Sequence, residues 1–189
     1  MLVISISLYA TKMARAKIYI EKPIITNVMR RVAIQDAERI CEIYNYYVLN
    51  STVTFDTEPY TLKMMENKIQ SLINGGYDYW VYEVDGLILG FCHLNEWKPR
   101  RGYRFTAETS IYVDKDFIGR GIGVVMMKHM LENVNKEKIH TILSCISLPN
   151  DSSVRVHERF GFQLAGLYKQ IGFKLGEWRD VGYWQMMVQ

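Results

Sequence analysis

Three glycines stand within five positions, at 119, 121 and 123, directly before an apolar run that favours a helix. Each glycine weakens a helix by up to about 1 kcal/mol, so the cluster needs a compensating role. A strand ending at Val113 and a helix starting near Gly123 leave several backbone amides unpaired and aimed at one point. The helix dipole adds about half a positive charge, and Arg120 adds a full one. This pattern predicts a site for a pyrophosphate.

Two common phosphate-binding motifs do not match this loop. A P-loop requires Lys followed by Ser or Thr after its last glycine, where this chain has Val124 and Val125. The dinucleotide pattern requires a third glycine where Val124 stands, and a strand–helix–strand opening that the preceding hairpins do not supply. A plain tight turn between a strand and a helix is the remaining alternative.

A second candidate site is the segment at 96–105, in which basic and aromatic residues are interleaved. Guanidinium forks bind carboxylate and phosphinate groups in pairs, and aromatic rings supply walls for a small molecule. The segment therefore predicts a clamp for a small acid, with a solvated basic loop as the alternative. Its cations and rings are Lys98, Arg100, Arg101, Arg104, Trp97, Tyr103 and Phe105.

Predicted strands and helices, which must position these groups, alternate along the chain. Strand-like runs occupy 29–34, 79–84, 87–94, 103–113, 138–147, 164–173 and 178–188. Apolar residues at helical spacing predict helices over 37–50, 62–73, 123–135 and 150–160, with Asp36 and Thr61 as caps of the first two. The order β-α-α-β-β-β-α-β-α-β-β predicts an α/β fold, a mixed, mostly antiparallel sheet with helices on its faces.

Composition limits the class of protein. The 189 residues carry a net charge of +3 and 49% hydrophobic residues, ordinary for one globular domain without a membrane span. The chain has no Lys/Arg stripe typical of a nucleic-acid binder. Cys41, Cys92 and Cys145 lie far apart without metal-ligand spacing, so we expect buried thiols, a cytoplasmic protein and no metal. The apolar start lacks the flanks of a signal peptide, so residues 1–28 are expected to extend a domain at 29–189.

Longer matches connect these segments to one family. The stretches AETSIYV, GRGIG and LPNDSSVRVHERFGF resemble the acetyl-CoA signature of the GNAT N-acetyltransferases. Within that superfamily, STVTFDTEP, VYEVDG, WKPRRGY and GFKLGEWRDVGYWQ resemble the phosphinothricin acetyltransferases, so the similarity covers about residues 31–185. The resemblance implies the GNAT fold and an enzyme that transfers acetyl from acetyl-CoA to an amine.

The resemblance also implies the cofactor contacts. It assigns the pantetheine arm to the backbone of Ile111, Tyr112 and Val113. Asn150 and Arg159 match positions near the cofactor on the following loop and helix. Ile118 departs from the Gln or Arg that is usual there, and we expect altered affinity because backbone amides make most of the contacts. The pyrophosphate cradle is expected at Gly119, Arg120, Gly121, Ile122, Gly123 and Val124.

Amide formation from a thioester requires a neutral amine, so a base must remove its proton. Glu108 precedes the pantetheine-binding segment, where burial would raise its pKa, and the resemblance places the family's base there. A salt-bridged strand glutamate is the alternative. His157 stands where this subfamily carries histidine, and we expect it to protonate the departing thiolate, with ordinary packing as the alternative. Cys92 and Cys145 lack a partnered base, which favours direct attack by the amine.

The expected acceptor is the α-amino group of a small amino-acid-like acid such as phosphinothricin, methionine sulfoximine or methionine sulfone. Lys98, Arg100 and Tyr103 match the family's substrate segment, and Phe55 is expected on the opposite wall or in a core or hinge role. Another amine, such as a polyamine or a protein N-terminus, and a non-catalytic CoA-binding module are the alternatives. The aromatic residues Trp178, Tyr183 and Trp184 predict a subunit interface, and the resemblance implies that the protein is a homodimer.

Overall fold

The computed structural model describes residues 27–188, so the extension predicted at 1–28 lies outside the described residues except for its last two. Four helices and seven strands follow the predicted order, which is therefore confirmed. The helices are α1 (Ala37–Asn50), α2 (Leu62–Asn74), α3 (Ile122–Asn133) and α4 (Asp151–Arg159). The strands are β1 (Asn27–Arg31), β2 (Tyr79–Val84), β3 (Leu87–Glu96), β4 (Thr106–Val113), β5 (Thr141–Leu148), β6 (Gln163–Lys174) and β7 (Glu177–Met187).

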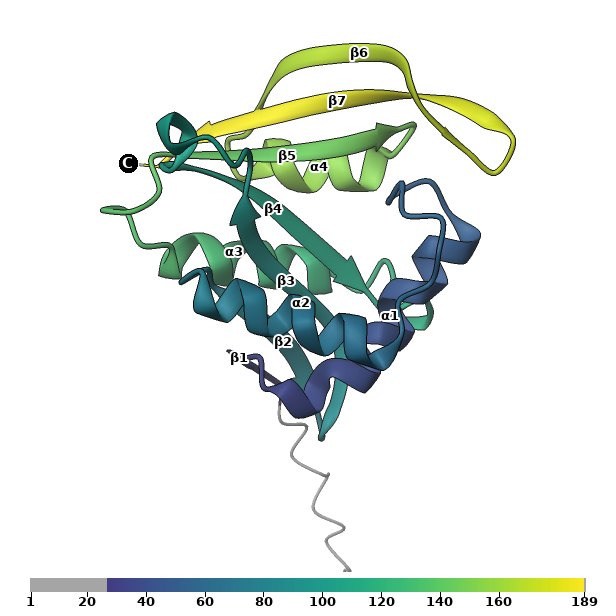
Figure 1. Cartoon of the computed structure of the whole chain (residues 1–189), viewed down its shortest axis with the longest axis vertical. Coiled ribbons are helices and arrows are strands. Elements are labelled where there is room, and N and C mark those ends of the chain that lie inside the picture. Colours follow the sequence, from purple (N-terminus) through teal and green to yellow (C-terminus); the bar gives the residue numbers. More distant parts are fainter. Residues whose placement is uncertain (1–26, 189) are drawn as a thin grey trace, which may run out of the picture.

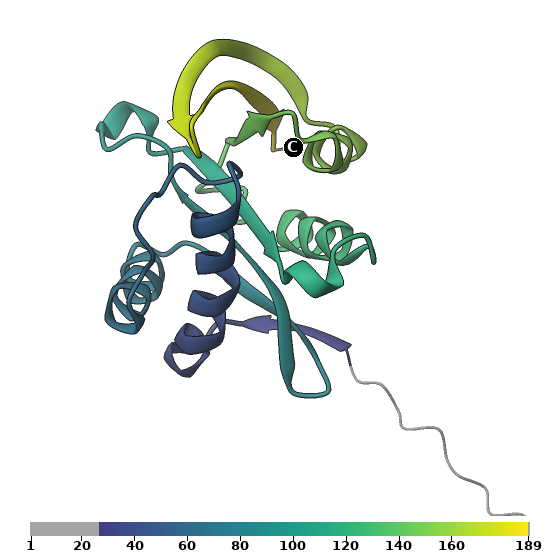
Figure 2. The ribbon, with the colours of Figure 1, turned by 90° about the vertical axis from the view of Figure 1, so that its right-hand side faces the viewer.

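All seven strands form one sheet in the order β1-β2-β3-β4-β5-β7-β6. Neighbouring strands are antiparallel except β4 and β5, which run parallel, so the mostly antiparallel sheet is confirmed. Helices α1 and α2 cover one face of the sheet, and α3 and α4 lie on the opposite side (Figures 1 and 2). No helix within residues 27–188 is long and apolar enough to cross a membrane.

Two predicted features at the start of the domain are wrong. The first strand ends at Arg31, and a short 3-10 turn over Ile34–Asp36 precedes α1. The Asp36 side chain does not cap α1, because its carboxylate accepts the amide of Ala33 at 2.8 Å and pairs with Arg30 at 2.7 Å. Thr61 caps α2 as predicted, since its hydroxyl accepts the Met64 amide at 3.2 Å.

Other boundaries shift by a few residues for local reasons. Residues 101–103 form a 3-10 turn, so the strand predicted from 103 starts at Thr106. Helix α3 begins at Ile122, because Gly121 has a φ of 81° and serves as its N-cap. The helix ends at Asn133, since Val134 adopts an extended conformation.

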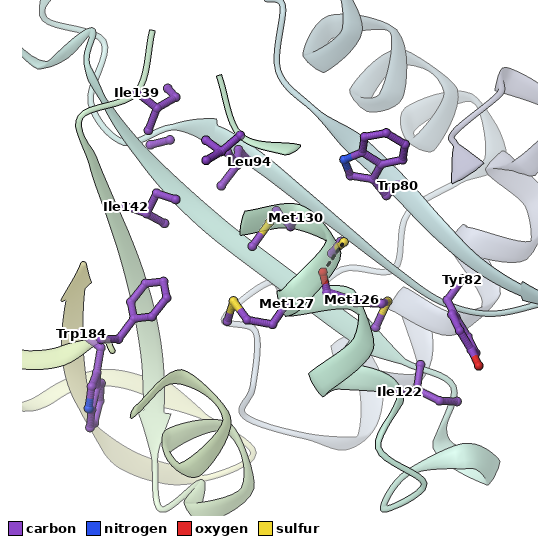
Figure 3. Close-up of a cluster of buried hydrophobic side chains, with 14 of the residues drawn as sticks. Trp80, Tyr82, Leu94, Ile122, Met126, Met127, Met130, Ile139, Ile142 and Trp184 are labelled. Atoms are coloured by element: carbon purple, nitrogen blue, oxygen red, sulfur yellow. Dashed lines mark hydrogen bonds between the residues drawn. The ribbon is translucent and has the colours of Figure 1, made fainter. Parts of the chain in front are cut away.

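Two apolar cores lie on opposite faces of the central strands. Side chains alternate along β3, so Phe91 faces the core under α1 and α2 while Cys92 and Leu94 face α3. Figure 3 shows the α3 side, where three methionines of that helix pack beside the strands. Trp184 belongs to this core and is only 4% exposed, so its predicted place in a subunit interface is wrong.

The sheet divides between its two central strands. Strand β4 pairs with β5 only over three positions, from Thr106↔Thr141 to Glu108↔Leu143. Beyond this point β4 continues along β3 to Val113, and β5 continues along β7 to Leu148. The facing edges of 109–113 and 144–148 therefore have no strand partner. Apart from the Val113 carbonyl, which accepts the Tyr47 hydroxyl, their outward backbone groups are available to a ligand.

Candidate active site

A cleft of about 770 Å³ lies where β4 and β5 separate. This volume is within the usual range of about 300–1,000 Å³ for small-molecule sites. On one face of the sheet the cleft is lined by the loop before α3 and by α4, and on the opposite face by α1, α2 and the segment between them (Figures 1 and 2). We call these the α3 end and the α2 end. Glu108 lines the wall between them, at the last position where β4 still pairs with β5.

The α3 end has the geometry of an anion site. Gly119 and Gly121 both have a φ of 81°, a conformation that only glycine adopts readily. A Cβ added at position 119, 121 or 123 would meet no atom within 4 Å, so the backbone faces open space. Within the described residues, Val124 is the first amide of α3 with a backbone partner, the Gly121 carbonyl at 3.0 Å. The amides before it therefore remain available to a pyrophosphate, and the local geometry fits one.

Glu108 is half-buried on the face of β4 that points towards α1 and α2. Its cross-strand neighbour is Asn95, which also lines the cleft. Burial raises the pKa of Glu108, and the nearby Lys98 ammonium partly opposes this shift. A raised pKa brings a carboxylate closer to the working range of a general base.

His157 lies on α4 with its ring almost fully buried, and it lines the cleft. Its Nδ1 is 2.8 Å from the Ser153 carbonyl oxygen, so Nδ1 carries the proton and donates it. The ring also contacts Phe162 edge-on at 5.1 Å between centroids. Burial lowers the pKa of His157, so the neutral ring with an unprotonated Nε2 is favoured at neutral pH. Donation of a proton to a thiolate requires the opposite, charged form.

The remaining predicted residues fall into two groups. Those that line the cleft are Ile111, Tyr112, Val113, Gly119, Gly121, Ile122, Gly123, Val124, Asn150 and Phe55. Asn150 also caps α4, because its Oδ1 accepts the Ser153 amide at 3.2 Å. Those that are exposed and do not line the cleft are Lys98, Arg100, Tyr103, Arg120 and Arg159. Arg120 stacks over Phe117 with 4.7 Å from its guanidinium carbon to the ring centroid.

The hairpin of β6 and β7 holds the wall that carries Phe55. Gly172 of β6 lies against the Phe55 ring, and a Cβ at this glycine would lie 2.2 Å from the ring atoms. The buried Lys174 donates to the Thr54 carbonyl at 2.7 Å. The C-terminal hairpin therefore fixes the segment between α1 and α2 at the α2 end of the cleft.

Sequence reasoning did not identify several polar residues at the α2 end. Lys68 follows Met65 by three positions, on the stripe of α2 that faces the core. A lysine on such a stripe is the signal that could have identified it. The other residues are Tyr44, Asp56, Tyr60, His93 and Asn95, which also line the cleft. Within the described residues, no group of His, Cys, Asp or Glu side chains is placed to hold a metal ion.

Comparisons with known proteins agree with this geometry. The acetyltransferase (GNAT) domain matches residues 29–182. The chain is 34% identical to the phosphinothricin N-acetyltransferase of Streptomyces viridochromogenes over 157 residues, covering 83% of this chain and 85% of the relative. It is 30% identical to the L-methionine sulfoximine/L-methionine sulfone acetyltransferase of Pseudomonas paraeruginosa over 159 residues, covering 84% and 92%.

A solved structure extends the similarity to three dimensions. The phosphinothricin acetyltransferase of Sinorhizobium meliloti in complex with AcCoA superposes with a TM-score of 0.83 at 29% identity, covering 86% of this chain and 89% of that one. This chain belongs to the GNAT acetyltransferase family.

Proposed function

We propose that this protein transfers acetyl from acetyl-CoA to the α-amino group of a small amino-acid-like acid. The observation that carries the proposal is the cleft itself, which joins an anion-accepting helix N-terminus to a half-buried carboxylate with a raised pKa. The named relatives act on phosphinothricin and on methionine sulfoximine or sulfone. Acceptors of that type are therefore the first candidates.

The residues of the α3 end would hold the cosubstrate. Acetyl-CoA supplies an acetyl group activated as a thioester. The amides at the start of α3 would bind its pyrophosphate, and the unpaired edge of β4 at 111–113 would hydrogen-bond the pantetheine arm. An amide of the same edge would stabilise a developing oxyanion.

Glu108 is the proposed general base. Its position between the two ends allows it to receive a proton from an amine that enters at the α2 end. Direct attack by this amine is favoured over a covalent enzyme intermediate. Burial raises the pKa of both Cys92 and Cys145, and Cys145 lines the cleft, so their thiolate forms are disfavoured.

A substrate panel tests the proposal. Purified protein is mixed with acetyl-CoA and free amino acids, phosphinothricin, methionine sulfone, spermidine or a short peptide, and released thiol is measured. We expect one acid to exceed the other amines in kcat/KM by about a hundredfold, or about 2.7 kcal/mol. A preference for spermidine or the peptide would support acetylation of a different amine. Calorimetric binding of acetyl-CoA without turnover would support a non-catalytic CoA-binding module.

We also infer that two copies of the chain associate through the hairpin of β6 and β7. Strand β6 is an edge of the sheet, and its outward side chains are mostly exposed. The cytoplasmic location expected from the three free cysteines stays a prediction.

A further inference from the structure

Lys68 occupies an unusual position at the α2 end of the cleft. Its Nζ stands 4.7 Å from the ring centroid of Tyr44 and 5.2 Å from that of Tyr60. Within residues 27–188 the ammonium has no hydrogen-bond acceptor and no carboxylate oxygen within 4 Å. Burial lowers the pKa of Lys68, and the negative charge of Asp56 opposes this shift. The two aromatic faces stabilise the cation only in part, because Lys68 is half-buried and its ammonium has no acceptor to replace the lost water.

Lys68 is also the single lysine or arginine among the described residues that line the cleft. Asp56, the acid whose charge acts on Lys68, already accepts a hydrogen bond from the Tyr44 hydroxyl at 2.6 Å. The imidazoles do not supply a second cation, because burial lowers the pKa of His93 to about 3 and also lowers that of His157. Lys68 is therefore the one cation in the lining that an anionic ligand can contact, although the Lys98 ammonium is close enough to act on Glu108.

A second polar group at this end has no partner. The Nδ1 atom of His93 is buried without a hydrogen-bond partner among the described residues, and the side chain lines the same cleft. His93 as a whole is only 3% exposed. Buried polar atoms normally find a partner, but this atom has almost no accessible surface, so a ligand in the cleft would meet the His93 ring and not its Nδ1.

We propose that Lys68 binds the acidic group of the acceptor and thereby selects amino acids over neutral amines and polyamines. The inference rests on the proposed function and names the side chain that sets its specificity. It differs from the expectation drawn from the basic segment, because Lys98 and Arg100 are exposed and lie outside the cleft lining. The acidic end of the acceptor would contact Lys68 while its amine faces Glu108.

The test compares one acid with its neutral analogue. L-methionine sulfone and its α-amide are assayed by thiol release with wild-type protein, Lys68→Met, Lys68→Arg and Lys63→Met. We expect Lys68→Met to lower kcat/KM for the acid by at least about thirtyfold, mainly through KM, because it removes binding of the acidic group. The amide should change by less than about threefold, and Lys68→Arg should recover part of the loss. Lys63 is exposed on the same helix, so Lys63→Met is the matched control.

Three results would overturn the inference. An equal loss on the acid and the amide would indicate a structural role, which thermal melting of the variant would also register. An unchanged preference for the acid over the amide in Lys68→Met would show that Lys68 does not bind the acidic group. A loss of activity on the acid alone in Lys98→Met would assign this role to the basic segment instead. Wild-type protein that acetylates the amide as well as the acid would show that no group selects the charge.

A binding measurement separates this inference from the proposed function. Calorimetry with methionine sulfone and protein saturated with CoA requires no turnover. Binding to wild-type protein that is lost in Lys68→Met supports the inference even if no amine is acetylated. Turnover of amino acids together with unchanged binding in Lys68→Met refutes the inference and leaves the proposed function in place. Absence of any binding to the wild-type complex also refutes it.

Discussion

At the scale of single residues, Glu108 combines two effects that favour a base over a structural ion pair. It stands at the fork of β4 and β5, where a ligand can reach it, and burial raises its pKa. No oxygen of Glu108 lies within ion-pair distance of a cation in the described part of the chain, so the salt-bridged alternative is not supported.

Replacement of this carboxylate should separate activity from stability. We expect Glu108→Gln to lower kcat by about 10²–10⁴, the usual contribution of a general base. The folded-state pKa of Glu108 lies above its unfolded-state pKa. Charging Glu108 therefore destabilises the fold as pH rises from the unfolded-state value through the folded-state value. The variant avoids this cost, so its melting temperature at pH 7 should equal or exceed that of the wild type. Thiol release and thermal melting measure the two effects, and an unchanged rate would refute the base assignment.

The pH profile provides an independent check on the same residue. Wild-type kcat/KM should fall on the acid side as Glu108 becomes protonated, with a midpoint above the ordinary glutamate pKa of about 4.3. The fall should be missing from the residual activity of Glu108→Gln. A midpoint at or below the ordinary value would contradict the effect of burial.

His157 is expected to remain neutral at pH 7. Its folded-state pKa is lowered by burial, so the imidazole should titrate below about 6.5 in an NMR experiment. The fold should lose stability as pH falls through the interval between the unfolded and folded values, because the unfolded chain binds the proton first. His157→Gln should lack this acid sensitivity. A rate that declines as pH rises through the measured pKa of His157 would instead support the proton-donor role expected from sequence.

Sequence patterns located most of one wall of the cleft but only Phe55 on the other. Glu108, His157 and the glycine loop belong to contiguous segments with strong motifs, and the structure places them along one cleft. Lys68, Tyr44 and His93 come from different elements, and no local spacing connects them. Their proximity depends on how α1 and α2 pack against β3, which is a property of tertiary structure.

At the scale of elements, two glycines at the N-terminus of α3 allow a test that separates the effect of backbone conformation from the effect of steric contact with the ligand. Gly121 has a φ of 81°, so Gly121→Ala should destabilise the protein by about 1 kcal/mol and weaken acetyl-CoA binding. Gly123 has no such backbone constraint and faces open space, so Gly123→Ala should leave stability unchanged or slightly higher. We nevertheless expect weaker acetyl-CoA binding, because the added methyl group enters the proposed cradle.

Calorimetry and chemical denaturation measure these two effects for both variants. Full acetyl-CoA affinity in Gly123→Ala would show that the pyrophosphate does not approach this turn. A loss of affinity without a loss of stability would distinguish a ligand contact from a folding defect.

Element identity was more predictable than element boundaries. Hydrophobic spacing indicated every helix and strand, because each element buries one periodic face. The errors arose where a short turn replaced regular structure. Asp36 binds Arg30 and the Ala33 amide in place of a helix cap, and residues 101–103 form a 3-10 turn. Such contacts depend on partners that helical or strand periodicity does not reveal.

At the scale of the whole molecule, the described part of the chain has a single sheet with two apolar cores. The outer hairpin of β6 and β7 leaves many of its apolar side chains exposed. Strands β1 to β5 are flanked by helices, whereas β6 is an edge strand beyond β7. Its large exposed side chains are Leu164, Leu167, Tyr168, Ile171 and Phe173, with Leu175 and Trp178 at the turn and on β7. Several large exposed apolar side chains on one edge hairpin favour an interaction site.

Association of two chains through this hairpin predicts that the sedimentation mass depends on Trp178. Its side chain is 60% exposed and contacts Phe173 within the hairpin, so it contributes little to the core. Trp178→Glu should therefore shift a dimer towards the monomer, because a charge in an apolar interface is poorly solvated. Leu62→Glu, at an exposed apolar position on α2, is the control and should leave the mass unchanged. A wild-type protein that sediments as one chain at every concentration would refute the dimer. A dimer that persists in Trp178→Glu would place the interface on another face, away from the hairpin that anchors Phe55 at the cleft.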